Sequence, residues 1–183
     1  MSTAYDVADF FIDVALDDPE NHLTNMRVNK LLYFAQGWSL ARRGIPLFED
    51  DFCAWTYGPV VPEVYHKLKI SGKEKIRGVM NDNYMSNISA EEKRILLDVL
   101  YEYNRYSTGG LVELSHKQGG PWANAIKSGE GTKITKTAIK DYFGSLPPLQ
   151  EFRLRVPQDA IVGHRDAATG NYVLPKEWDD ESL

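Results

Sequence analysis

One segment, residues 23–43, restricts the fold of this 183-residue chain more than any other. Thr24 or Asn25 can serve as its N-cap, and Gly44 follows its last turn, where Arg42 and Arg43 favour the carboxyl end of a helix. Apolar and aromatic side chains cover nearly its whole circumference: Met26, Val28, Leu31, Leu32, Tyr33, Phe34, Ala35, Trp38 and Leu40. A helix that is apolar on all sides is normally enclosed by other elements. We therefore expect a fold built around a central, buried helix.

Shorter helical patterns surround this segment. Residues 3–17 combine an apolar face with an opposite side that carries Asp6, Asp9, Asp13 and Asp17. Ser89 and Glu92 form a capping box that predicts a helix from there to about Tyr106. Further helices are expected over residues 62–69, 109–118, 121–128 and 135–144, whereas residues 71–88 are typical of a polar loop. The expected fold class is mainly α, a compact multi-helix domain of about six helices.

Two parts of the sequence depart from the helical pattern. Residues 45–61 contain β-prone side chains between prolines and Gly58, and predict a short β-hairpin insertion. After Pro147 and Pro148 a period of two runs through Glu151–Val156, and Asp166–Gly170 is typical of a hairpin connection between residues 161–162 and 171–174. We expect a helical domain over residues 1–146 and a small C-terminal β appendage with an acidic end over 147–183.

Composition and motifs argue against most kinds of chemistry. The net charge of −5 does not favour a broad nucleic-acid interface, and the one cysteine, Cys53, excludes an internal disulfide or a Cys-rich zinc site. The four histidines have no metal-ligand spacing, and no phosphate-binding loop or pair of acid–base carboxylates is recognisable. We predict no enzymatic activity, no metal and no cofactor. A nucleophilic Cys53 with a nearby histidine is the weakest alternative.

Targeting signals are also not recognisable in the sequence. The start of the chain lacks the cationic and apolar regions of a secretory signal. No stretch approaches the roughly 18 apolar residues that a membrane helix needs. We expect a cytoplasmic protein without a membrane partner.

Three sequence blocks closely resemble the Panacea domain of prophage-associated, SocA-like antitoxins. They are Lys30–Trp38, Gly44–Phe48 and Phe52–Tyr65; the last contains the string Ala-Trp-Thr-Tyr-Gly-Pro-Val. Further on, Leu114–His116 followed by Pro121–Trp122 resembles the second part of the family pattern. The resemblance spans roughly residues 5–145. It implies a mostly helical binding domain that neutralises a cognate toxin, and it brings no catalytic residues with it.

The motif residues are interpreted as mainly structural, with Gly58 allowing an unusual φ in a turn. They are Lys30, Leu31, Tyr33, Trp38, Trp55, Tyr57, Gly58, Pro59, Tyr65, His116, Pro121 and Trp122. Partner contacts are expected instead in the C-terminal tail, at Phe152, Leu154, Tyr172 and Trp178.

The predicted function is therefore that of an antitoxin that binds a cognate toxin encoded nearby. Two alternatives are open. An adaptor would hand the toxin to a protease, which would then be a second partner, as the resemblance implies for some family members. A DNA-binding regulator of its own operon is supported only by the basic run from Lys67 to Arg77, and nucleic acid is not the partner we expect.

Overall fold

The computed structural model describes residues 2–16, 23–153, 164–165 and 172–173. The chain forms two compact units, Met1–Phe152 and Arg153–Leu183. The described residues contain eight α-helices: α1 (Ala4–Leu16), α2 (Asn25–Arg43), α3 (Pro62–Leu68), α4 (Tyr84–Asn87), α5 (Ala90–Tyr103), α6 (Thr108–Ser115), α7 (Pro121–Ala125) and α8 (Lys136–Gly144). The mainly α fold class is confirmed. No helix among these residues is both long and apolar enough to cross a lipid bilayer.

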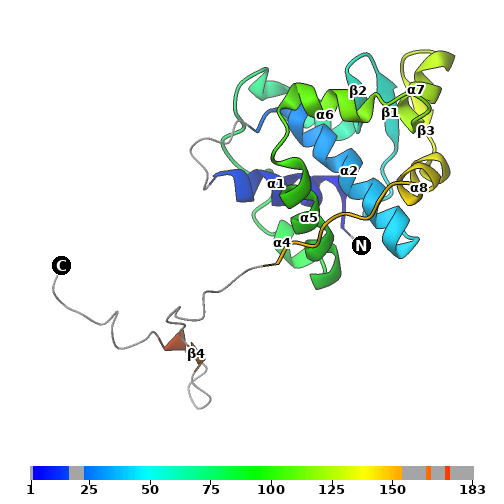
Figure 1. Ribbon diagram of the computed structural model, residues 1–183. Coiled ribbons are helices and arrows are strands. Elements are labelled where there is room, and N and C mark those ends of the chain that lie inside the picture. The colour runs from blue at the N-terminus through cyan, green and yellow to red at the C-terminus, as the bar shows by residue number, and fades with distance from the viewer. Residues whose placement is uncertain (1, 17–22, 154–163, 166–171, 174–183) are drawn as a thin grey trace. The chain divides into compact units, whose positions relative to one another are not determined.

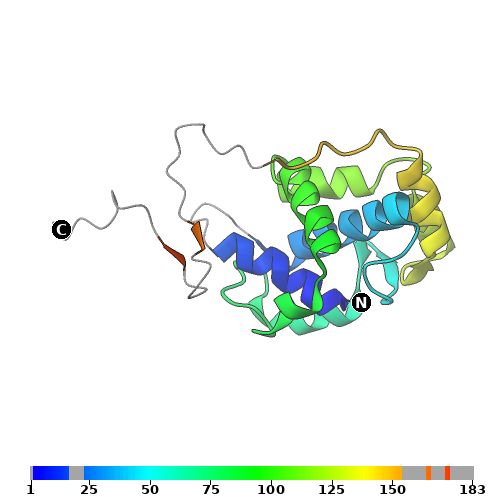
Figure 2. The ribbon, with the colours of Figure 1, turned by 90° about the horizontal axis from the view of Figure 1, so that it is seen from below.

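Helix α2 runs through the middle of the first unit, with α1, α5, α6 and α8 packed around it (Figures 1 and 2). Its first turn is capped by the Thr24 hydroxyl, which accepts a hydrogen bond from the Arg27 amide, and its last turn ends at Gly44 with φ of 73°. All but a few of its side chains are buried. The predicted central helix is confirmed, together with its caps.

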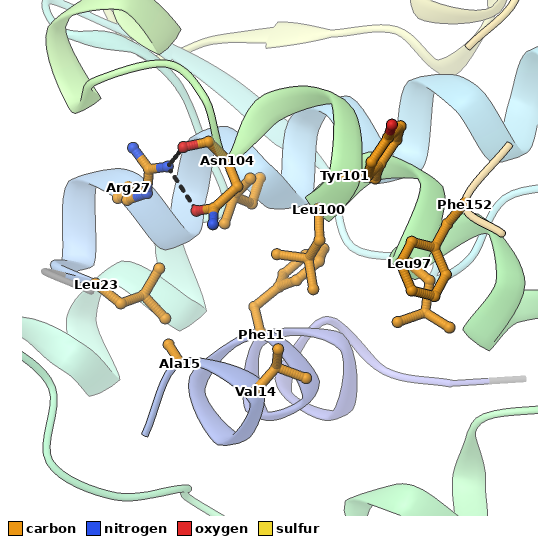
Figure 3. A pocket seen from close by; sticks show the side chains of 11 residues that line it. Phe11, Val14, Ala15, Leu23, Arg27, Leu97, Leu100, Tyr101, Asn104 and Phe152 are labelled. Carbon is orange, nitrogen blue, oxygen red and sulfur yellow. Dashed lines mark hydrogen bonds between the residues drawn. The ribbon is translucent and has the colours of Figure 1, made fainter. Parts of the chain in front are cut away.

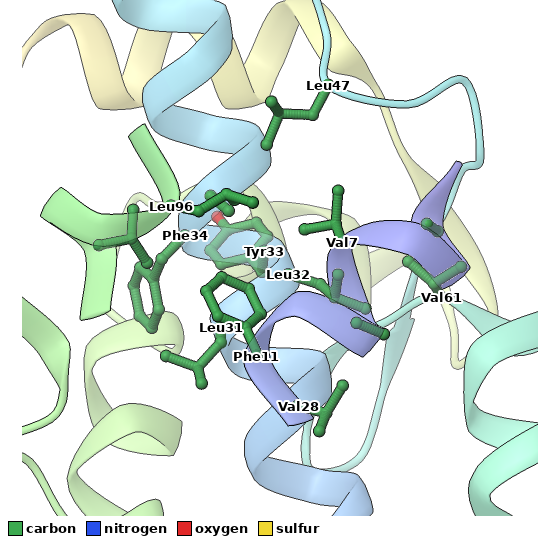
Figure 4. Close-up of a cluster of buried hydrophobic side chains, with 14 of the residues drawn as sticks. Val7, Phe11, Val28, Leu31, Leu32, Tyr33, Phe34, Leu47, Val61 and Leu96 are labelled. Atoms are coloured by element: carbon green, nitrogen blue, oxygen red, sulfur yellow. The ribbon is translucent and has the colours of Figure 1, made fainter. Parts of the chain in front are cut away.

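The core is formed where side chains of α1, α2 and α5 converge (Figure 4). Tyr33 lies at its centre, edge-on to Phe34, Phe52 and Phe143 with ring centroids 5.4–5.7 Å apart. Helix α8 approaches α2 closely at Gly37, where a Cβ atom would lie 2.4 Å from the Phe143 ring. This contact requires glycine, because any larger side chain would overlap the ring.

A small antiparallel sheet borders this helical core. Its strands are β1 (Phe52–Trp55), β2 (Gly58–Val60) and β3 (Thr132–Ile134), in the order β2-β1-β3. Trp55 pairs with Gly58 across the hairpin, and Ala54 pairs with Thr132 on the other side. The predicted hairpin is confirmed, whereas β3 was not predicted.

The acidic side of α1 is covered by a segment expected to be a polar loop. Asp9 is buried and accepts hydrogen bonds from the amides of Met80 and Asn81, at 2.7 and 2.9 Å. The α4 residue Tyr84 donates its hydroxyl proton to Asp13 at 2.6 Å. The expectation of a loop throughout residues 71–88 was wrong at α4, a helix of a single turn that is held by these contacts with α1.

Residues 147–153, which follow α8, form neither a helix nor a strand. Leu149 is buried, and its carbonyl accepts a hydrogen bond from Arg42 at 3.2 Å. The Phe152 amide donates to the buried Asp98 carboxylate at 2.6 Å. The strand predicted over Glu151–Val156 is wrong for residues 151–153, where the Phe152 amide binds a side chain and not a neighbouring strand. Residues 154–156 lie outside the described residues.

The second unit contains strands β4 (His164–Arg165) and β5 (Tyr172–Val173). They pair antiparallel, His164 with Val173 and Arg165 with Tyr172. The pairing confirms a C-terminal hairpin whose second strand lies within the predicted 171–174, whereas β4 lies after the predicted first strand. The first of its predicted strands, Ile161–Val162, lies outside the described residues.

Candidate functional site

Four motif residues from three different elements line one pocket of about 680 Å³. Lys30 comes from α2, Trp55 and Tyr57 from the end of β1 and the turn after it, and Tyr65 from α3. The rest of the lining is Thr24, Asn25, Met26, Asn29, Thr56, Val60, Lys69, Gly72, Lys73, Thr108 and Glu130. We call this space the motif pocket. Its walls are largely apolar and aromatic, which is typical of binding sites.

Lys30 is a buried cation in the wall of this pocket. Its side chain is only 1% exposed, and its Nζ donates a hydrogen bond to the Pro59 carbonyl at 3.1 Å. Among the described residues, no carboxylate forms an ion pair with it. Burial lowers the pKa of Lys30 to about 7, because the charged ammonium loses its hydration.

Gly58 makes room for Lys30 in the hairpin turn. Its φ is +108°, and a Cβ atom at this position would lie 2.8 Å from Nζ and Cε of Lys30. The same Cβ would lie 3.0 Å from Nε2 of His116. Glycine therefore meets two requirements here, a backbone conformation that L-residues rarely adopt and the close approach of two motif side chains.

The second motif block supports the hairpin from α6 and α7. The rings of His116 and Trp122 are stacked, with centroids 3.5 Å apart and planes 2° from parallel. Trp122 Nε1 donates to the Trp55 carbonyl at 2.9 Å. Burial is the main cause that lowers the pKa of His116, and the charge of Lys30 lowers it further. A hydrogen bond with the Tyr57 backbone raises this pKa, but by less. The two blocks thus form one connected structure.

Two buried asparagines on α2 attach the hairpin and α3 to the central helix. Asn29 accepts a hydrogen bond from the Val61 amide at 3.0 Å and donates to Asn25 Oδ1 at 2.9 Å. Asn25 donates in turn to the Tyr65 carbonyl at 3.0 Å. Sequence reasoning missed both residues, although two amide side chains one turn apart in an apolar helix were a signal for them.

The mouth of the pocket reaches the surface at several exposed residues. Tyr57 is 66% exposed, and Lys69 and Lys73 from the segment after α3 are exposed as well. On another part of the rim, Glu130 accepts hydrogen bonds from the amide and hydroxyl of Thr56, at 3.0 and 2.8 Å. These bonds lower the pKa of Glu130, so the rim carries charges of both signs.

The motif residues lie within a recognised domain. Residues 28–123 match the family model "Antitoxin SocA-like, Panacea domain", and the match contains every motif residue from Lys30 to Trp122. The chain belongs to this family. It is also 35% identical over 158 residues to "Antitoxin SocA" of Caulobacter vibrioides (strain NA1000 / CB15N), an alignment that covers 75% of this chain and 80% of that protein. No solved structure matches the chain.

Not every Panacea motif residue contributes to the pocket. Leu31, Tyr33 and Trp38 lie in the core, where Trp38 Nε1 donates to the Tyr103 hydroxyl at 3.0 Å. Pro121 is the buried first residue of α7. The motif therefore combines residues that build the helical core with residues that line the pocket.

The predicted tail contacts are placed only in part. Phe152 is half-buried, with its ring 6.0 Å from that of Tyr101. It lines a second, largely apolar pocket of about 430 Å³ between α1, α2 and α5, in which Arg27 donates to Asn104 (Figure 3). Of Tyr172 only the backbone, in β5, is described, and Leu154 and Trp178 lie outside the described residues.

Two kinds of chemistry find little support in the described part of the chain. No group of three His, Cys, Asp or Glu side chains there is placed to hold a metal ion. Burial, and next the charge of Asp51, raise the pKa of the Cys53 thiol. Because the thiolate is the nucleophile, this shift makes Cys53 less reactive than a free cysteine.

Proposed function

We propose that this chain is a cytoplasmic, non-enzymatic antitoxin that neutralises its toxin by direct binding, and that the motif pocket and its rim make the contact. Membership of the SocA-like antitoxin family supports the role. One observation supports this location of the toxin contact: four motif residues line one pocket that reaches the surface, namely Lys30, Trp55, Tyr57 and Tyr65.

The composition of the pocket suits a protein partner. Trp and Tyr are the residues most often found at the energetic centre of interfaces, because they bury a large area with few rotatable bonds. Tyr57 projects from the hairpin, and Trp55 and Tyr65 are only partly buried. A stable complex would cover this face with an interface of about 1,600 Å² in total. Neutralisation then follows from mass action and needs no reaction.

The test is co-expression of the full chain with the product of the neighbouring toxic reading frame. We expect the two to co-purify, and Tyr57→Ala to weaken the complex at least about tenfold, as expected for a tyrosine at the energetic centre of the interface. The control is Met85→Ala on α4, because Met85 is an exposed apolar side chain, 39% exposed, that lines neither of the two pockets. Equal affinity of Tyr57→Ala and wild type would exclude the motif pocket as the contact.

The same cells distinguish the alternative mechanisms. Sequestration leaves the amount of toxin unchanged or increased, whereas delivery to a protease lowers it. The tail contacts predicted from the sequence are tested by a chain that ends after Arg153, which keeps the bonds of Leu149 and Phe152 to the helical unit. Full growth rescue by this shortened chain would remove residues 154–183, and with them Leu154, Tyr172 and Trp178, from the mechanism.

A further inference from the structure

We infer that the motif pocket receives an acidic side chain of the toxin, whose carboxylate pairs with Lys30 while the apolar residues next to it pack on Trp55 and Tyr65. This inference rests on the proposed function and adds the chemistry by which the partner is recognised. It follows from three properties of the pocket: a buried cation without a counter-ion, a net positive lining and an aromatic wall.

The position of Lys30 is the first property. A lysine normally extends its ammonium to water, and a buried one is normally paired with a carboxylate. Here the side chain ends beneath Gly58, with the Pro59 carbonyl at 3.1 Å as the acceptor that the structure gives it. An ammonium has three donors, so a carboxylate that enters the pocket can take up one that Pro59 does not use.

The charge of the lining is the second property. Lys30, Lys69 and Lys73 line the pocket against a single carboxylate, Glu130, which is engaged by Thr56. This local excess of positive charge contrasts with the net charge of −5 of the whole chain. The pocket therefore attracts an anionic group. The negative net charge of the whole chain disfavours binding of the same group elsewhere on the surface.

The wall identifies a peptide carboxylate as the anion. Trp55, Val60 and Tyr65 offer an apolar surface beside Lys30, which suits a side chain flanked by apolar residues. A carboxylate carries one charge, which matches the one buried ammonium, whereas Lys69 and Lys73 lie at the exposed rim. A phosphate is the alternative that the peptide experiment below tests.

Pairing with Lys30 has a consequence for pH. The pKa of Lys30 is about 7 in the free protein, and a carboxylate favours its charged form, so affinity should fall about tenfold per pH unit above 7. His116, which faces Lys30 from α6, has a pKa below its ordinary 6.5 and stays neutral in this range. Glu130 stays ionised, because its pKa is lowered. Tyr57, Tyr65, Lys69 and Lys73 are the other titratable residues of the lining.

The first experiment uses defined peptides as probes, with the full chain labelled for NMR. Acetyl-Leu-Glu-Leu-amide should shift the indole signals of Trp55 and Trp122 saturably at pH 6.5. The matched acetyl-Leu-Gln-Leu-amide, and the phosphoserine peptide of the same length, should bind at least tenfold more weakly. Equal binding of the glutamate and glutamine peptides would overturn the inference, and so would preferential binding of the phosphoserine peptide.

The second experiment assigns the preference to Lys30. Lys30→Met replaces the ammonium by an apolar group of similar length, and we expect it to abolish the preference for glutamate. The control, Lys67→Met at an exposed lysine of α3 outside the pocket lining, should keep it. If Lys30→Met does not fold, the ¹⁵Nζ chemical shift of Lys30 in the wild type tests the inference instead. When the glutamate peptide binds at pH 7.5, this shift should move from that of a partly neutral amine to that of a fully charged ammonium. An unchanged signal would overturn the inference.

The toxin complex separates this inference from the proposed function. If no complex forms with the toxin at any pH, the proposed function is wrong. If a complex forms whose affinity is the same at pH 6.5 and 8.5 and the same for Lys30→Met, the proposed function stands and the role of Lys30 is wrong.

Discussion

Substitution of Gly58 by alanine tests whether the hairpin turn and Lys30 depend on each other. The new Cβ would lie 2.8 Å from two atoms of Lys30 and 3.0 Å from His116 Nε2. Because Lys30 is buried, its end cannot swing freely into solvent. The ammonium must move, and its bond to the Pro59 carbonyl is lost or lengthened.

The expected cost is the sum of two effects. A non-glycine residue at φ of +108° costs on the order of 1–3 kcal/mol. Loss of a buried hydrogen bond from a charged or partly charged donor costs roughly 1.5–3 kcal/mol more. We therefore expect Gly58→Ala to lower the free energy of unfolding by about 2.5–6 kcal/mol.

The measurement is urea unfolding followed by tryptophan fluorescence, with Gly129→Ala as the matched control. Gly129 has a similar φ, +120°, but nothing lies within 4 Å of its Cβ position. The control should therefore lose only the backbone contribution of about 1–3 kcal/mol. If the two variants are destabilised equally, the packing of Lys30 against the turn is not tight and the reasoning fails.

Three further predictions concern the helical unit. Gly37→Ala should lower the free energy of unfolding by about 1–3 kcal/mol in urea, because its Cβ would overlap the Phe143 ring; equal stability would show that α8 can move away. Asp98→Ala should also lower the free energy of unfolding by about 1–3 kcal/mol, and it should accelerate hydrogen exchange of the Phe152 amide, because the substitution removes the acceptor of this amide. An unchanged exchange rate would contradict this prediction. Burial alone would raise the pKa of Glu92, but hydrogen bonds and the nearby Arg43 lower this pKa below its ordinary 4.5. The ionised Glu92 side chain therefore stabilises the fold above pH 4.5, and this stabilisation is lost on acidification. Glu92→Gln should therefore be less stable than wild type at pH 7 and show a weaker loss between pH 5 and 3, and parallel pH profiles of the two proteins would refute the assignment.

The elements that the sequence predicted are those with local signals at their ends. The Thr24 cap and Gly44 bound α2, and the capping box of Ser89 and Glu92 begins α5. In contrast, β3 and α4 are three and four residues long. β3 pairs with β1 from a distant part of the sequence, and α4 is held by its contacts with α1, so no local signal marks either element.

The candidate site, like the fold, could be predicted from the sequence only in part. The motif residues could be selected from the sequence one by one, but the pocket depends on α2, the hairpin and α3 coming together, which no local pattern describes. The aspartates of α1 illustrate the difference as well. Periodicity placed them on one side of the helix, but only the fold shows that residues 80–84 cover Asp9 and Asp13.

The floor of the motif pocket belongs to the helix that forms the core, and this limits how a family of such proteins can diverge. A substitution at Lys30 or Asn29 is selected for folding as well as for binding, because both side chains also hold the hairpin in place. Thr56 and Lys73 are exposed at the rim and can change without disturbing the core. Related chains that encounter different partners are therefore expected to diverge first at the rim, while the buried floor is inherited unchanged.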